Sequence, residues 1–326
     1  MDKSSDIEVL RHAIEWLEDG AAIVLVTVAG TWGSSPRQPG SLMAIHPEGE
    51  FVGSVSGGCV EDDLVQRVLK GEFDNLRPTL LEYGVGTAAL QRVGLPCGGR
   101  LTLLVEGIES ASQLRQVLEV VESRQLIQRH VCLTTGETRL QPGWYANAFS
   151  FDGNTLLKVF GPHLRLLIVG AGELARRVAQ LALTLDYTVT LCDPRPEYAH
   201  NWQVAGAAFV TTTPQHTVAQ FQPDTRTAVL VLSHTPAIDD EALFAALQTE
   251  AFYVGALGSA KHQAARRKRL QQQGLTLTQL QRLHGPVGLE IGSHTPAEIA
   301  VSIIAALIAE RNSTRQSLDA VLSAHG

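Results

Sequence analysis

The sequence predicts an α/β protein. Its C-terminal half reads as a Rossmann-like, doubly wound parallel sheet, and its N-terminal half as an α+β domain. An apolar run from Leu164 to Val169 has the composition of a strand buried on both faces, as in parallel sheets. The turn that follows, Gly170–Ala175, fits the pattern G-x-G-x-x-A and opens an amphipathic helix. A second strand, Thr188–Cys192, leads to Asp193, where a dinucleotide-binding fold places its ribose-binding acid.

Length and composition indicate a globular protein of about two domains. The chain has 326 residues, 44% of them hydrophobic and 18% charged, with a formal net charge of −7. This charge argues against general nucleic-acid binding, which needs a basic face for the phosphates. We expect no secretory signal and no membrane span, since the most apolar helix, Ile299–Ala309, is shorter than the ~20 residues a span needs. Four cysteines without a C-x-x-C pair indicate neither a zinc site nor a disulfide framework, and favour a cytoplasmic protein with reduced thiols.

The N-terminal domain, residues 1–160, is expected to combine helices with antiparallel strands. A polar loop rich in glycine and proline, Thr31–Gly40, has the composition of a binding loop. The periodicity of the apolar residues and the turn residues between them predict these helices, strands and one hairpin, in chain order: Asp6–Leu17, Ala21–Ala29, Ser41–His46 with Phe51–Val55, a helix to Leu69, Pro78–Tyr83, Leu101–Val105, Ser112–Arg124, Arg129–Leu133, Ala148–Phe151 and Leu156–Phe160.

Two glycine segments of this domain carry a cysteine. Ser56-Gly57-Gly58-Cys59 opens a helix, and its glycines leave backbone N–H groups uncovered, which predicts an anion nest. A helix start favours a thiolate, but the acids of the first turn, Glu61 to Asp63, oppose that effect. The second segment is Cys97-Gly98-Gly99. Each cysteine on its own has an ordinary reading as a small buried or turn residue, whereas the recurrence of Cys beside Gly-Gly favours a functional role. Cys132 lies in an apolar strand and is expected to pack.

The C-terminal domain, residues 161–326, is expected to begin at the Gly161-Pro162-His163 junction. Ligands bind such sheets outside the carboxyl ends of the strands. The candidate binding residues there are Gly170, Gly172, Asp193, Arg195, the segment Ser233-His234-Thr235, and a second glycine turn with Gly258 and Ser259. Beyond the opening unit, the pattern predicts strands Ala208–Thr211, Ala228–Leu232 and Phe252–Ala256, with helices around Val218 and over Asp240–Leu247.

The second glycine turn has two readings. Lys261 lies in the first turn of the helix that follows, where a cation opposes the helix dipole unless an anion binds beside it. Alternatively, Lys261 is a solvated residue of an amphipathic, arginine-rich helix that contains Arg266, Arg267, Lys268 and Arg269. The sequence leaves both open.

Several of these stretches together resemble the xanthine dehydrogenase accessory factor (XdhC/CoxI) family. They occur in family order over nearly the whole chain: Gly33–Arg37 with Pro39-Gly40, Gly53–Glu61, Cys97–Gly99, Gly170–Gly172, Asp193–Arg195, Tyr253–Gly255 with Gly258-Ser259, and Gly285–Ser302. The family commonly has His-Val after Gly-Ala-Gly, and here Glu173-Leu174 stand instead. Where the last helix of the family often carries Ala-Glu, this chain has Ala305-Ala306.

The resemblance implies an accessory protein rather than an enzyme. Its cargo would be the molybdenum cofactor, in the molybdopterin form or, given the change at Glu173, a dinucleotide form. The implied partners are a cysteine desulfurase that supplies the terminal sulfur, an apo molybdenum hydroxylase such as xanthine dehydrogenase, and a second copy of the chain in a homodimer. The expected contacts are Ser56, Gly57, Gly58, Cys97, Gly98, Gly170, Gly172, Asp193, Arg195, Gly258 and Ser259, with Cys59 touching the molybdenum end.

Two other classes of function stay open. An NAD(P)-dependent oxidoreductase would use the Gly170–Gly172 turn, with Asp193 on the ribose and His234 as acid or base. That reading assigns no role to the cysteine loops of the first half. A pure adaptor with a vestigial Rossmann fold would bind neither pterin nor dinucleotide.

Overall fold

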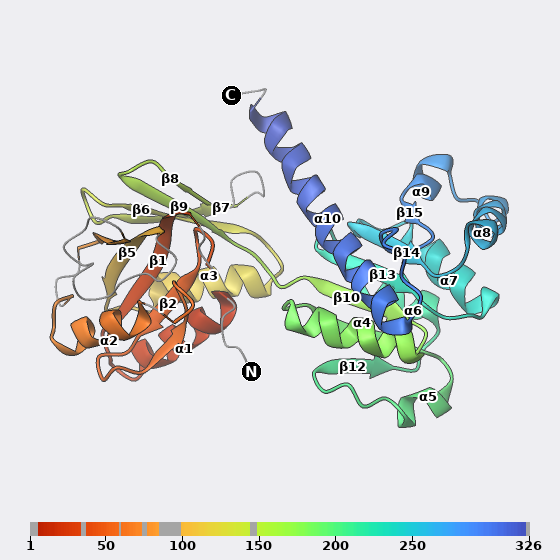
Figure 1. The fold of residues 1–326 in the computed structure, drawn as a ribbon, viewed down its shortest axis with the longest axis horizontal. Helices are drawn as coiled ribbons and strands as arrows, with labels where there is room; N and C mark the ends of the chain where they lie inside the picture. Colours follow the sequence, from red (N-terminus) through yellow and green to blue (C-terminus); the bar gives the residue numbers. More distant parts are fainter. Residues whose placement is uncertain are drawn as a thin grey trace. The chain divides into compact units, whose positions relative to one another are not determined.

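A computed structural model of the protein describes residues 6–33, 37–58, 60–73, 77–84, 99–143 and 149–323, with side chains described as far as residue 312. The chain divides into two compact units, Met1–Pro162 and His163–Gly326 (Figure 1). The first unit contains antiparallel sheets with helices, and the second a parallel sheet covered by helices. The predicted fold class is therefore confirmed. Among the described residues, no helix combines the length and the apolar character needed to cross a lipid bilayer.

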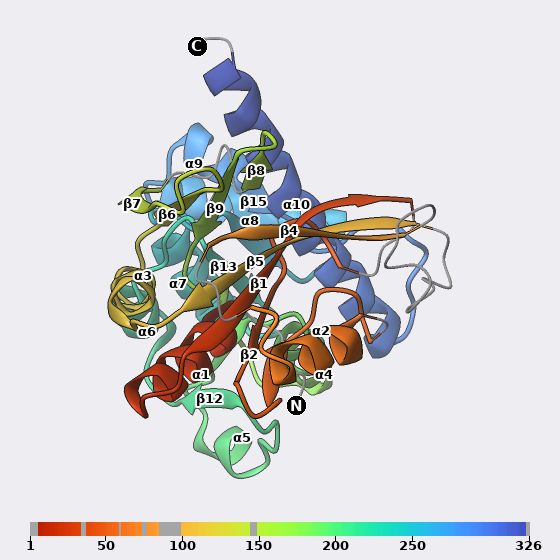
Figure 2. The ribbon, with the colours of Figure 1, turned by 90° about the vertical axis from the view of Figure 1, so that its left-hand side faces the viewer.

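The larger sheet of the N-terminal unit is antiparallel, with strand order β3-β2-β1-β5-β4. Figure 2 labels four of these strands, β2, β1, β5 and β4. Apolar residues alternate along β1, so that Ile23 and Leu25 face one hydrophobic cluster while Val24 and Val26 face another. Helices α1 and α3 cover the first face and α2 the second. The strands are β1 (Ile23–Trp32), β2 (Leu42–Ile45), β3 (Phe51–Gly53), β4 (Thr79–Gly84) and β5 (Arg100–Ile108), and the helices α1 (Asp6–Glu18), α2 (Glu61–Leu69) and α3 (Ser112–Glu122).

A second antiparallel sheet of this unit has the order β7-β6-β9-β8, from β6 (Ile127–Cys132), β7 (Thr138–Pro142), β8 (Phe149–Phe151) and β9 (Thr155–Phe160). The sequence pattern did not predict β7, whose side chains are largely exposed and therefore carry no apolar alternation. A buried ion pair joins the sheets, because both terminal nitrogens of Arg129 on β6 donate to Glu106 on β5, at 2.9 and 2.8 Å.

The C-terminal unit is built on a parallel sheet with the order β12-β11-β10-β13-β14-β15. Numbered within the unit this is 3-2-1-4-5-6, the order of the Rossmann fold, with its switch point between β10 and β13. The strands are β10 (Arg165–Val169), β11 (Thr188–Cys192), β12 (Ala207–Val210), β13 (Thr227–Val231), β14 (Tyr253–Ala256) and β15 (Leu283–His284).

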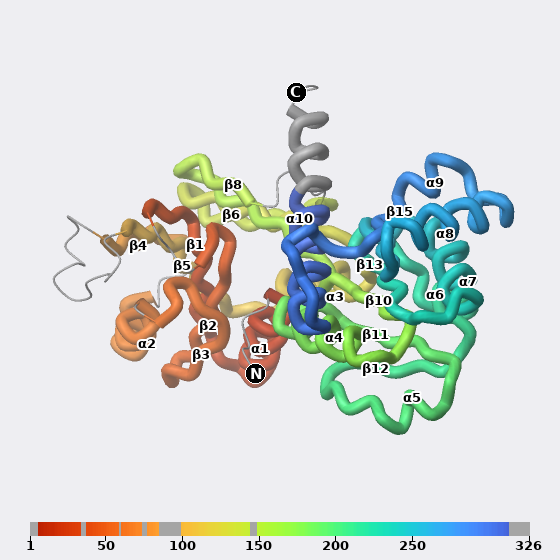
Figure 3. Tube along the Cα trace, turned by 45° about the vertical axis from the view of Figure 1, so that its right-hand side comes forward, coloured from red at the N-terminus to blue at the C-terminus, as the bar shows by residue number. Residues whose placement is uncertain are grey.

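Helices cover both faces of this sheet (Figure 3). Leu166 and Ile168 of β10 pack with α4 and α10, whereas Leu167 and Val169 pack with the helices of the opposite face. The helices are α4 (Glu173–Thr184), α5 (Pro196–His200), α6 (Pro214–Phe221), α7 (Pro236–Ala246), α8 (Ala260–Gln272), α9 (Leu277–Gln281) and α10 (Pro296–Ser323). The sequence pattern missed α5, α9 and β15, which are too short to show a period.

Candidate functional site

The turn between β10 and α4 is held in place by the chain's own atoms. Gly170 has a φ of +100°, and a Cβ on it would lie 2.6 Å from the backbone nitrogen of Ser233, just past the end of β13. Glycine is therefore required at this position. The N–H of Ala171 donates to Asp193 Oδ2 at 2.9 Å, which ties the turn to the end of β11.

Asp193 is fully buried, and the chain supplies donors to both of its carboxylate oxygens. Arg195 donates its backbone N–H at 3.1 Å and its guanidinium at 2.8 and 2.7 Å. Burial opposes ionisation of this carboxyl, but the bonds from Arg195 and Ala171 outweigh it and lower the pKa of Asp193. Asp193 thus braces the turn, and a carboxylate so engaged is poorly placed to receive a ribose. Arg195 also lies over the ring of Tyr198, at 4.0 Å.

Gly172 differs from Gly170 because nothing in the described chain requires a glycine there. Its φ is −97°, and a Cβ on it would meet no atom within 4 Å. The position is exposed at the start of α4, where backbone N–H groups attract anions. Glu173, the next residue, is half exposed and pairs along its own helix with Arg177 at 2.9 Å. Its charge is thus partly balanced by a neighbour.

A cavity of about 630 Å³ opens beside the carboxyl ends of β13 and β14. Both predicted residues of the second glycine turn, Gly258 and Ser259, line it, and so does His234. Gly258 has a φ of +131°, and the Ser259 side chain accepts the N–H of His262 at 3.4 Å as the cap of α8. Lys261 is exposed and does not line this cavity. Its other lining residues are Ser233, Pro236, Asp239, Leu257, His262, Ala265, Arg266, Arg269, Pro286, Val287, Ser293 and Ile299.

A buried polar network supports this second turn from behind. The Arg266 guanidinium donates to Asp239 at 2.7 Å and to the carbonyl of Leu257 at 2.9 Å. The Gln263 amide donates to the carbonyls of Ala256, at 2.9 Å, and Gly258, at 3.3 Å. Three successive carbonyls of the turn are therefore held toward α8, which fixes the orientation of its peptide groups.

The sequence pattern predicted neither this network nor the burial of Arg266. Its side chain is 7% exposed, because positions 263, 266 and 270 share the inward face of the helix. Burial raises the pKa of Asp239, although Ser233 and Arg266 bond to its carboxylate. The spacing of 263, 266 and 270 was the signal in the sequence, but two of the three residues there are polar.

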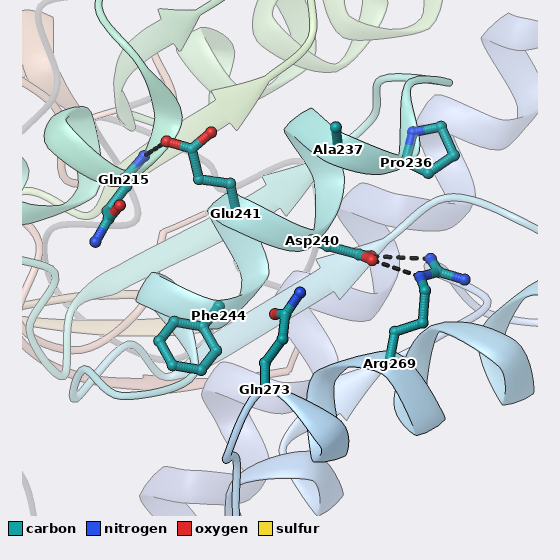
Figure 4. A pocket seen from close by; sticks show the side chains of 8 residues that line it. All are labelled: Gln215, Pro236, Ala237, Asp240, Glu241, Phe244, Arg269 and Gln273. Carbon is teal, nitrogen blue, oxygen red and sulfur yellow. Dashed lines mark hydrogen bonds and ion pairs between the residues drawn. The ribbon is translucent and has the colours of Figure 1, made fainter.

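A second cavity of about 630 Å³ lies beside the first, between α6, α7 and α8. Figure 4 shows Arg269 reaching from α8 to Asp240 on α7, with two hydrogen bonds of 2.5 and 3.0 Å. Arg269 and Pro236 line both cavities, so this ion pair stands where the two adjoin. Phe244 supplies an apolar surface and Glu241 accepts the N–H of Gln215 at 3.3 Å.

In the N-terminal unit, the predicted anion nest is present, but the anion in it is the carboxylate of Glu61. Backbone N–H groups donate to it from Val55 (3.0 Å), Ser56 (2.9 Å), Gly57 (3.2 Å), Gly58 (3.0 Å) and Val60 (3.1 Å). The hydroxyls of Ser54, at 2.6 Å, and Ser56 add two more donors. Gly57 and Gly58 have φ of +82° and +113°, which turns their N–H groups inward.

Glu61 is 4% exposed. Burial alone would raise its pKa, but the bonds from Ser54 and Ser56 outweigh burial and lower the pKa to about 2. The sequence suggested a helix-dipole acid for Glu61, because nothing in the spacing shows that its side chain turns back onto the preceding loop.

Three glycines, Gly33, Gly84 and Gly99, lie close together at one end of the larger sheet. Strand register pairs Trp32 at the end of β1 with Arg100 at the start of β5, and Arg100 with Gly84 at the end of β4. A Cβ on Gly33 would lie 3.3 Å from the Cα of Gly99, so the backbones of these two glycines are in contact. A cavity of about 230 Å³ lies there, with Trp32, Tyr83 and Arg100 in its wall.

The start of α2 reaches the same end of the sheet. Tyr83, next to Gly84 on β4, donates its hydroxyl to Asp63 in the first turn of α2 at 2.6 Å. Burial, with Asp63 close by, raises the pKa of Tyr83. The first turn of α2 is thus tied to the end of β4, next to the pair formed by Gly84 and Arg100.

Three predicted contact residues, Cys59, Cys97 and Gly98, lie outside the described residues. Of the described thiols, Cys192 is buried and Cys132 is partly exposed. The expectation that Cys132 packs in a core was wrong, since it is the last residue of β6 and accepts the Asn154 amide at 3.7 Å. Within the described ranges, no group of three His, Cys, Asp or Glu side chains is arranged to hold a metal ion.

The fold defines a two-unit protein whose C-terminal unit has the Rossmann strand order and a cavity beside its strand ends. Family comparison is specific: residues 166–307 match the XdhC Rossmann domain, and residues 16–84 match the XdhC and CoxI family. A protein of Escherichia coli (strain K12) named "Molybdenum cofactor insertion chaperone PaoD" is 31% identical over 311 residues, covering 93% of this chain and 88% of that protein. The chain belongs to the XdhC and CoxI family, as its motifs predicted.

Two further proteins are similar to this chain over nearly its full length. A Bacillus subtilis (strain 168) protein, whose name describes a probable component of xanthine dehydrogenase, is 27% identical over 321 residues, covering 90% of this chain and 95% of the relative. A solved structure described as a xanthine dehydrogenase from Bacillus halodurans superposes with a TM-score of 0.75 at 26% identity, covering 96% of this chain and 97% of that one.

Proposed function

We propose that the protein binds the molybdenum cofactor, holds it while a cysteine desulfurase supplies the terminal sulfur, and delivers it to an apo molybdenum hydroxylase of the xanthine dehydrogenase kind. The observation that carries the proposal is the cavity beside Gly258 and Ser259, in a chain related over 93% of its length to a protein named as a molybdenum cofactor insertion chaperone. We also propose that two copies of the chain form a homodimer and that the protein acts in the cytoplasm.

The second glycine turn suits the phosphate of the pterin. Its carbonyls at Ala256, Leu257 and Gly258 are taken by Gln263 and Arg266, which leaves the cap of α8 facing the cavity. A helix start with a serine cap is a common phosphate site. Gly172 has open space where a side chain would be, which suits a ligand close to the backbone. The volume of about 630 Å³ accommodates more than a phosphate.

At the molybdenum end, soft thiolate chemistry suits the metal and its sulfur. We propose that Cys59 contacts or protects this end, with Cys97 second, in company with Ser56, Gly57, Gly58 and Gly98. Gly57 and Gly58 are exposed, and a Cβ on Gly58 would meet nothing within 4 Å. Gly170, Asp193 and Arg195 would act by shaping the first turn, with the exposed part of Arg195 free to approach an anion.

Pterin that stays bound through purification tests this proposal. Protein from molybdenum-replete cells is expected to carry pterin, detected by its fluorescence after oxidation and identified by mass spectrometry. Cys59→Ala is expected to lose most of it, because the thiolate contact to the metal end is gone. Cys132→Ala, which removes a partly exposed thiol elsewhere in the same unit, is the control and should retain pterin. Wild-type protein without pterin would argue against the proposal.

The two glycines of the first turn offer a matched pair of variants. Gly170→Ala is expected to destabilise the protein by about 1–3 kcal/mol or more, since it forces a side chain into the left-handed region and onto Ser233. Gly172→Ala should stay within about 0.5 kcal/mol of wild type in urea unfolding. It should nevertheless lower bound pterin several-fold, because its methyl group occupies the ligand side. Undiminished pterin in Gly172→Ala would place the ligand elsewhere.

An NAD(P)-dependent oxidoreductase remains the second candidate, favoured by the 3-2-1-4-5-6 strand order and by the G-x-G-x-x-A turn. A native-state ligand raises the melting temperature by mass action. A clear rise in melting temperature with NAD(P)H at modest concentration would favour this candidate. We expect no such rise, because the carboxylate of Asp193 is already bonded to Ala171 and Arg195.

A further inference from the structure

We propose that Glu61 is the built-in anion of the Ser54–Val60 loop, and that it positions this loop for the cargo while closing its amide nest to phosphate. The second half of this inference rests on the proposed function. The first half, that Glu61 fills the nest and positions the loop, concerns the loop alone and is tested separately.

The bonding pattern supports an anion site rather than an ordinary cap. A helix cap satisfies one or two N–H groups, whereas Glu61 accepts five backbone N–H groups and two hydroxyls. Both carboxylate oxygens take part, Oε1 with the donors from Ser54 to Gly57 and Oε2 with those from Ser56, Gly58 and Val60. These donors surround the Glu61 carboxylate as they would surround a bound oxyanion.

The loop gains a fixed shape from this arrangement. The segments on both sides of Cys59 bond to the same oxygen, because the N–H groups of Gly58 and Val60 both reach Oε2, at 3.0 and 3.1 Å. Val55 and Val60 are buried in the core cluster that also contains Leu64 of α2. A carboxylate anchored on its own helix therefore connects the loop to a rigid element.

The same arrangement determines what the loop offers to a ligand. Its N–H groups point inward to Glu61, so they are not available to the phosphate of a cargo. The outward surface consists of Gly57 and Gly58, which are exposed. We therefore expect this loop to contact the cargo by close approach of the Gly57 and Gly58 backbone, and to leave phosphate binding to other segments.

Hydrogen exchange on the full-length protein tests the first half directly. Exposed loop amides ordinarily exchange fast. The Gly58 N–H donates to Glu61 at 3.0 Å, whereas the Gly57 N–H is shared between Glu61, at 3.2 Å, and the Ser54 hydroxyl, at 3.1 Å, so Gly58 is the sharper reporter of the two amides. Their exchange is expected to quicken about tenfold to a hundredfold in Glu61→Gln, the range that corresponds to loss of charge-assisted bonds. Asp62→Asn is the matched control, since Asp62 is an exposed acid in the same helical turn, and it should keep the protection. Unprotected Gly57 and Gly58 amides in the wild type would overturn the inference, whether or not any variant folds.

Chemical rescue distinguishes a nest from a merely structural residue. Glu61→Ala leaves the donors in place and removes the anion, so sodium acetate should restore amide protection and bound pterin, whereas sodium chloride at equal ionic strength should not. Acetate without effect on either readout would overturn the positioning role. If the wild type carries no pterin, the proposed function fails, and the exchange data still decide whether Glu61 fills the nest.

Discussion

Replacing Arg266 by methionine is expected to lower the free energy of unfolding of the C-terminal unit by about 3–5 kcal/mol, the usual cost of breaking a buried ion pair. Arg266 and Asp239 are 7% and 4% exposed in their side chains, and their closest atoms are 2.7 Å apart. Methionine fills similar space but removes the positive charge that faces the Asp239 carboxyl. Burial already raises the pKa of Asp239, and its bond from Ser233 remains in the variant. The carbonyl of Leu257 also loses its bond from Arg266.

Urea unfolding measures this loss, and Lys268→Met provides the matched control on the exposed face of the same helix. That control should change the free energy of unfolding by no more than about 0.5 kcal/mol. The double variant Arg266→Met with Asp239→Asn should recover part of the loss, since it removes the unpaired charge. A loss below about 1 kcal/mol in Arg266→Met would show that the pair is not buried as described. Bound pterin should fall in Arg266→Met if the turn at Gly258 and Ser259 holds the cargo.

Acid is expected to remove a large stabilising contribution from Glu61. Its pKa is about 2 in the folded protein against an ordinary value of 4.5. A carboxyl group with a lower pKa in the folded than in the unfolded protein stabilises the fold at any pH above its pKa in the unfolded chain. This contribution disappears as the pH falls through its pKa in the folded protein. The shift corresponds to on the order of 3 kcal/mol, present at neutral pH and lost progressively from about pH 4.5 towards pH 2.

Glu61→Gln should therefore be less stable than the wild type at pH 7, and the difference should shrink as the pH is lowered from about 5 to about 3. Urea unfolding at a series of pH values measures it. Asp62→Asn should show no such convergence, because Asp62 is exposed and outside the nest. A difference between wild type and Glu61→Gln that stays constant over this range would mean that the carboxylate is not ionised in its nest.

Much of the fold was predictable because its strongest signals are local. The buried run before Gly170, the glycine turn and the amphipathic helix after it lie next to one another in the chain, and each has a periodicity that depends only on its own backbone. The alternation in β1 and the period of α1 are signals of the same kind. Elements such as α9 and β7 were missed because one is too short and the other too exposed to have a period.

The candidate site was predictable only in part. Gly258 and Ser259 do line a cavity, because strand ends in a parallel sheet gather at one edge. Asp193 stands where the pattern placed it, but its carboxylate points to Ala171 and Arg195 rather than outward. Glu61 was recognised as an acid near a helix start, and its actual partners lie on the loop that precedes it.

The sequence by itself determined the Rossmann unit, the two glycine turns and the family, since each rests on residues adjacent in the chain or in a fixed order along it. Only the tertiary structure decided which polar groups find each other. Arg266 meets Asp239 across two helices, Gly33 touches Gly99, and the Glu61 carboxylate fills a nest that looked open. The physical reason is that hydrogen bonds depend on direction and distance at the ångström scale. Strand register and the positive φ of Gly57 and Gly58 set those quantities, and no sequence spacing contains them.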